Sequence, residues 1–224
     1  MNTVNGFLHA RNAYVGALFL MALSILSLSF PMTYVGVSVK AGFPARAVGI
    51  AEICALIAAS FLPTFTKPHF NKAELKAPPS RRAIHSIFTA LVIISPCLPA
   101  ITWYLRIKWS ELGYQLPGII GFLGTPIILG SLSMLALLLA GRAASIVIPT
   151  LVFSTIVVTQ HLFPAGITAQ LFATAKNWHS SWLLVSALFM LALLLSYPLA
   201  SLPYRRQRRL ALIIHFSKRG NVLK

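Results

Sequence analysis

Six long apolar stretches follow one another between Arg11 and Lys224, and most basic residues lie in the connections on one side of them. A helix needs about 20 apolar residues to cross the hydrocarbon core of a bilayer. The stretches therefore predict six spans, near residues 13–33, 47–66, 83–105, 116–140, 143–163 and 181–203. The predicted class is an all-α integral membrane protein with a lead over residues 1–12, a transmembrane domain over 13–203 and a basic tail over 204–224.

The basic residues indicate how these spans are oriented. With six spans, the N-terminus, the connections after the second and fourth spans, and the tail share one side, which holds 14 of the 19 basic residues. Because Lys and Arg concentrate in cytoplasmic connections, we expect a multi-pass protein of the cell membrane with both termini cytoplasmic (N-in/C-in). Aromatic side chains prefer the membrane interface. The opposite side accordingly collects such residues at its boundaries: Trp103, Tyr104, Trp109, Tyr114, Trp178 and Trp182.

Composition excludes several classes of function. The formal charge of +16 follows from the cytoplasmic connections, so it requires no nucleic-acid partner. The chain has no Asp and only three Glu, which argues against enzymes that hold Mg²⁺ on carboxylates. No HExxH or GxxxxGK pattern occurs, and no metal or nucleotide cofactor is expected. We therefore expect a protein that is not an enzyme. Cys54 and Cys97 lie inside apolar stretches, as is typical of packing residues.

Glu52 is the one acidic residue within a predicted span. An ionisable residue inside a membrane is a candidate functional residue, and Glu52 is the candidate here. If the helix begins near Arg46, the two residues are separated by about 9 Å along its axis. The favoured interpretation is that Glu52 lies near the outer interface, either hydrated or paired with a neighbouring helix.

Small residues predict close helix packing at two places. Ala51, Ala55 and Ala59 share one face of the second span, which allows another helix to approach closely. The fourth span is rich in glycine and proline. Those residues are Gly118, Gly121, Gly124, Gly130, Pro117 and Pro126. They favour either close packing or a functional kink, and both interpretations stay open.

Two cytoplasmic segments are candidates for partner binding. The connection over residues 67–82 is polar and contains three prolines, which makes it the best docking surface for a soluble partner. The tail begins with Arg205, Arg206, Arg208 and Arg209, and it continues with an apolar patch. Such a segment is expected to contact anionic lipids of the inner leaflet, although a plain stop-transfer anchor needs only the charges.

The layout resembles one transporter family. The features are the short polar lead ending at Arg11, the basic connection over 67–82, the tight Gly141-Arg142 turn and the apolar segment 164–180. Together they resemble permease subunits of ABC exporters of the second type, especially small subunits of bacteriocin or lantibiotic export and immunity systems. The most similar stretch is 118–161. The resemblance implies six helices per subunit, a second permease subunit and a separate cytoplasmic ATPase. It places Glu74, Arg81 and Arg82 in the loop that contacts the ATPase.

The expected function is thus a permease-like subunit that exports a peptide, lipid or drug-like substrate. Two alternatives remain. One is the six-helix vitamin-binding subunit of an uptake system, which packs a small-residue face of its first helix against a scaffold. Ala10, Ala13 and Ala17 supply a fragment of such a face. The other is a membrane-embedded structural or immunity protein without a transport cycle.

Overall fold

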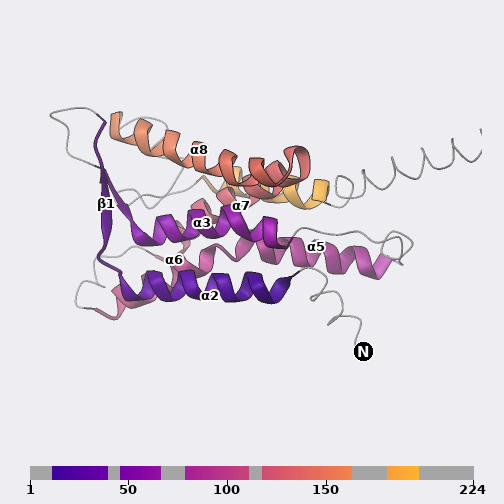
Figure 1. The fold of residues 1–224 in the computed structure, drawn as a ribbon, viewed down its shortest axis with the longest axis horizontal. Coiled ribbons are helices and arrows are strands. Elements are labelled where there is room, and N and C mark those ends of the chain that lie inside the picture. Colours follow the sequence, from indigo (N-terminus) through magenta and orange to yellow (C-terminus); the bar gives the residue numbers. More distant parts are fainter. Residues whose placement is uncertain (1–11, 40–45, 67–78, 111–117, 163–180, 197–224) are drawn as a thin grey trace, which may run out of the picture.

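The computed structural model describes residues 12–39, 46–66, 79–110, 118–162 and 181–196, with the backbone alone for 79–82. The predicted lead before residue 12 and the tail after residue 203 lie outside these ranges. The described chain is mostly helical (Figure 1). Its elements are α2 (Ala13–Ser29), β1 (Tyr34–Val37), β2 (Arg46–Gly49), α3 (Ile50–Phe65), α5 (Pro79–Ile94), α6 (Cys97–Lys108), α7 (Ile120–Ala140) and α8 (Arg142–Leu162), followed by a helix over Trp182–Ser196.

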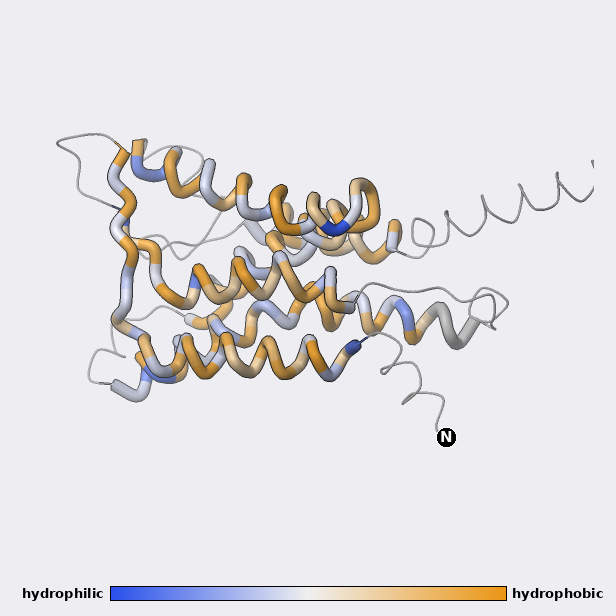
Figure 2. Tube along the Cα trace, in the orientation of Figure 1, coloured by the Kyte–Doolittle hydropathy of each residue, from blue (hydrophilic) through white to orange (hydrophobic). Residues whose placement is uncertain are grey.

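Two of the described helices are long and apolar enough to cross a membrane, namely α7 and α8. The bent pair of α5 and α6 makes a third if it counts as one span. The helices over Ala13–Ser29, Ile50–Phe65 and Trp182–Ser196 are apolar but shorter. Figure 2 shows apolar residues along most of the length of the helices. These properties support insertion of the helical bundle into a membrane.

The bundle has one end that carries the two strands, which we call the hairpin end. In Figure 1, α2 runs toward the hairpin end, α3 runs back from it, and α5 and α6 return to it. The α7 and α8 helices form an antiparallel pair around Gly141, whose φ of 94° lies in the region that glycine adopts readily. The chain therefore crosses the bundle in alternating directions.

The strands are a departure from the predicted all-α class. The first span was expected to reach residue 33, but α2 ends at Ser29, and Phe30 has φ −122° and ψ 54°. Pro31 disfavours a helical conformation at the residue before it. The Tyr-Val-Gly-Val run that follows is rich in residues that favour strands. It pairs antiparallel with β2, from Tyr34 opposite Gly49 to Val37 opposite Arg46.

The third predicted span is also interrupted. It consists of two helices bent by 44° at residues 95 and 96, because Pro96 has no N–H to continue the helical ladder. The Val92 carbonyl, which residue 96 would otherwise bond, accepts a hydrogen bond from Ser95 Oγ at 2.9 Å. The Ser95 hydroxyl thus supplies a donor to the carbonyl that Pro96 leaves without a backbone N–H.

Helix α3 lies at the centre of the core. Its Ala51, Ala55 and Ala59 are all buried, with exposed fractions of 6%, 3% and 0%. Ala59 belongs to the same apolar cluster as Ile128 and Leu129 of α7. The predicted close packing on this face is confirmed, and the neighbour is another helix of the same chain. Cys54 and Cys97 are buried as well, as expected of packing residues.

Two of the aromatic residues expected at the membrane interface are buried within the protein. Trp103 and Tyr104 are both buried and lie against Phe122, with ring centroids 5.4 and 5.3 Å apart. Trp103 Nε1 donates a hydrogen bond to the Pro31 carbonyl at 2.8 Å. The bond satisfies the indole N–H inside the protein, so this ring does not need the polar interface. Of the other described members of this group, Trp109 and Trp182 are exposed.

Candidate functional site

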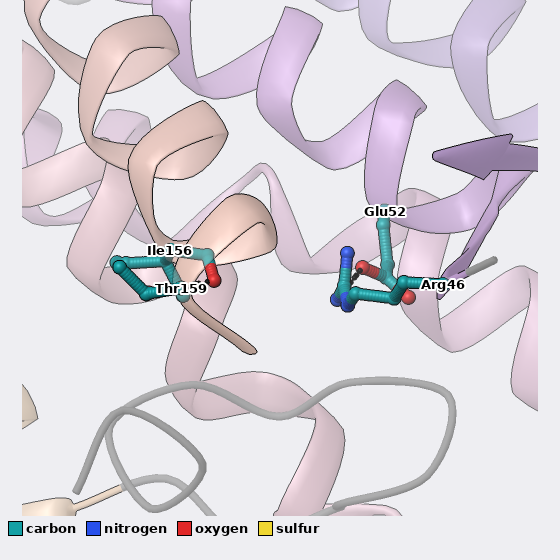
Figure 3. A network of polar contacts seen from close by, with 4 residues as sticks. All are labelled: Arg46, Glu52, Ile156 and Thr159. Atoms are coloured by element: carbon teal, nitrogen blue, oxygen red, sulfur yellow. Dashed lines mark hydrogen bonds and ion pairs between the residues drawn. The ribbon is translucent and has the colours of Figure 1, made fainter. Parts of the chain in front are cut away.

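The candidate site is an ion pair at the hairpin end. Arg46 Nη2 lies 3.1 Å from Glu52 Oε2, and the two side chains are 11% and 18% exposed (Figure 3). Arg46 is on β2, and Glu52 is in the first turn of α3. A carboxylate in the first turn also interacts favourably with the positive end of the helix dipole. The Glu52 carboxylate is therefore stabilised both by Arg46 and by the helix dipole, and both charged groups are largely buried.

The local backbone explains why the two residues meet. Strand β2 leads directly into α3, with Gly49 in an extended conformation as the N-cap residue. The Ile50 N–H donates to the Thr33 carbonyl at 3.1 Å, which ties the start of α3 to the segment before β1. The sequence estimate of about 9 Å along the axis assumed one continuous helix, whereas residues 46–49 form strand β2 and the helix begins at Ile50. The side chain of Arg46, on the strand, reaches Glu52 in the first turn of α3.

Helix α8 packs against the two strands next to this ion pair. Val37 and Val48 of the hairpin share an apolar cluster with Phe153 and Val157 of α8. In Figure 3, Thr159 lies across from the guanidinium of Arg46. Its hydroxyl donates to the Ile156 carbonyl at 3.0 Å. The next two residues, Gln160 and His161, are buried. The hairpin end thus gathers polar groups from β2, α3 and α8 on an apolar support.

The guanidinium of Arg46 has a donor that its pairing with Glu52 does not use. Arg46 Nη1 has no hydrogen-bond acceptor among the described residues, so the guanidinium retains a donor beyond its bond to Glu52. A guanidinium binds carboxylate, phosphate or carbonyl oxygens through such donors. Within the described ranges, no three His, Cys, Asp or Glu residues come together as a metal site.

The other predicted site residues lie elsewhere. Glu74 falls outside the described residues. Arg81 and Arg82 lie in the first turn of α5, so the helix begins earlier than the predicted start at residue 83. That turn is at the end of the bundle opposite the hairpin (Figure 1). Glu52 is paired with Arg46 of strand β2. Sequence reasoning missed Arg46 as its partner, although Gly49 between them signalled a possible break.

Comparisons of this chain with protein-family models, with curated proteins and with solved structures give no match.

Proposed function

We propose that this chain is a permease-like membrane subunit of an ATP-driven transporter that exports a peptide, lipid or drug-like substrate. A separate cytoplasmic ATPase supplies the energy, and a second permease subunit completes the path. The supporting observation is the burial of proline rings inside the bundle. Pro63, Pro96, Pro99 and Pro149 are each less than 2% exposed, and Pro126 of α7 is buried too.

Buried prolines are relevant because each one removes a backbone N–H from a helical ladder. In membrane proteins, interrupted helices are tolerated where neighbouring helices or hydroxyl side chains bond the freed carbonyls. They are also the points at which helices bend. The prolines inside α3, α7 and α8, together with the break between α5 and α6, suit a bundle whose helices change shape during a cycle.

The proposal includes six spans with both termini in the cytoplasm. Helix α3 has 16 residues. It is about 24 Å long, which is less than a hydrocarbon core of about 30 Å. Strand β2 continues directly from it and supplies additional length at the hairpin end. The alternating direction of the helices and the excess of basic residues on one side support the same topology.

Reporter fusions test this topology. Fusions after residues 75 and 215 are expected to report a cytoplasmic location, and a fusion near residue 110 an external one, because the basic connections stay inside. Alkaline phosphatase is active outside the cytoplasm and green fluorescent protein fluoresces inside it, so the two reporters give complementary signals. The reverse pattern would contradict the topology.

Co-purification tests the transport role. The full chain carries a tag on its tail, is extracted in mild detergent, and its associated proteins are identified. A stoichiometric ATPase whose turnover depends on this chain is the expected result. Replacing both Arg81 and Arg82 by Glu should release that ATPase if the connection over 67–82 docks it. The matched control replaces Arg106, an exposed cation at the hairpin end, and should retain the ATPase. A chain that purifies without an ATPase contradicts the proposal.

A further inference from the structure

Ser133 of α7 makes a buried hydrogen bond to another helix. Its Oγ donates to the Ser145 carbonyl of α8 at 2.8 Å, and the Ser60 carbonyl of α3 lies 3.5 Å from the same Oγ. Ser133 and Ser145 are both 0% exposed. The bond therefore joins α7 to α8 away from solvent, where an unpaired polar group is costly.

The Ser145 carbonyl needs this donor because of Pro149. In an α-helix, the carbonyl of residue i accepts from the N–H of residue i+4. Residue 149 is a proline inside α8, so the N–H that would bond Ser145 does not exist. Ser133 supplies the missing donor from the neighbouring helix. A hydrogen bond between α7 and α8 thereby replaces the backbone hydrogen bond that α8 lacks at Pro149.

We propose that Ser133 is a latch that holds α8 against α7 at a hinge formed by Pro149. Bending of α8 at this point breaks one side-chain hydrogen bond and no backbone bond at residue 149. When α8 moves away, the hydroxyl can turn to the Ser60 carbonyl, so its donor does not become unpaired. The latch follows from the packing of three helices, and it does not depend on the proposed transport role.

Ser131 provides a matched control two residues away on α7. It is also 0% exposed, but its hydroxyl donates to the Ile127 carbonyl of its own helix at 2.8 Å. That carbonyl already lies within reach of the Ser131 backbone N–H. Ser131→Ala therefore removes the same atoms as Ser133→Ala and leaves no carbonyl without a donor.

The test compares four variants of the full chain in mild detergent: Ser133→Ala, Ser131→Ala, Pro149→Ala and the Ser133→Ala/Pro149→Ala double variant. Amide hydrogen exchange is followed by mass spectrometry in peptides that cover residues 145–153, and thermal unfolding is recorded in parallel. Ser133→Ala is expected to exchange about ten-fold faster than the parent in this segment, because the Ser145 carbonyl loses its donor. Ser131→Ala should match the parent.

Pro149→Ala restores the backbone N–H, so Ser133→Ala should have little further effect in that background. This non-additivity distinguishes a latch over a proline gap from a general loss of packing. If Ser133→Ala does not fold, recovery of folding in the double variant supports the latch, and failure to recover overturns it. The latch is also overturned if Ser133→Ala exchanges like Ser131→Ala, or if its effect is the same with and without Pro149.

Discussion

Replacing Gly130 by alanine is expected to lower the thermal stability of this protein strongly. A Cβ atom at this position would lie 2.5 Å from the Ile93 carbonyl oxygen of α5, and 3.3 Å from the carbonyl carbon. Real Cβ contacts are almost never shorter than 3.0 Å, and backbone atoms cannot turn aside as a flexible side chain does. Overpacking of this kind costs about 1–3 kcal/mol, and a backbone obstacle favours the upper part of that range. Thermal unfolding of the purified variant in detergent measures the loss.

Gly16 is the control for this substitution, because no loss of stability is expected there. It lies within α2, where an added Cβ would meet only the side chains of Thr66 and Leu62, at 3.4 and 3.5 Å. These are ordinary contacts, so Gly16→Ala should be neutral or stabilising by up to about 1 kcal/mol through helix propensity. A Gly130→Ala variant as stable as the parent would show that α5 and α7 do not approach as closely as this structure has them.

The contact between Gly130 and the Ile93 backbone could not be predicted from the sequence. The glycine and proline content of the fourth span left packing and a kink equally open. At Gly130 the structure decides for packing, because the backbone of α5 occupies the space that a side chain would need. Sequence alone could not identify that neighbour, since the contact joins residues 37 positions apart. The apolar stretches did predict where helices form, because long apolar runs need internally bonded backbone in a membrane.

Predictions failed where a proline or glycine ended a helix inside an apolar run. Pro31 ended α2 early, and Pro96 divided the third predicted span into α5 and α6. Hydropathy does not detect the start of β1, because the valines of this strand are as apolar as residues in a helix. Strand β2 likewise occupies the start of the second predicted span, which was expected to be helical from residue 47. The docking connection was predicted as one loop, whereas Arg81 and Arg82 belong to α5.

Neutralising Glu52 is expected to destabilise the protein more than neutralising Arg46. Glu52→Gln leaves a guanidinium that is only 11% exposed without a counter-charge. Arg46→Gln leaves a carboxylate that is 18% exposed in the first turn of α3, where the helix dipole still stabilises it. Removing one partner of a fully buried pair costs about 3–5 kcal/mol, and the partial exposure here reduces the expected loss to roughly 1–2 kcal/mol for Glu52→Gln.

The Arg46→Gln/Glu52→Gln double variant completes this test, because it leaves neither charge behind. Its loss of stability should be smaller than the sum of the two single losses, by about 1 kcal/mol or more for groups in direct contact. Arg106→Gln, which removes an exposed cation near the same end, should change stability little. Additive losses would mean that the two charges do not interact in the membrane. If Glu52→Gln instead folds normally and abolishes transport, the carboxylate acts on the substrate path, and a purely structural role for the pair is wrong.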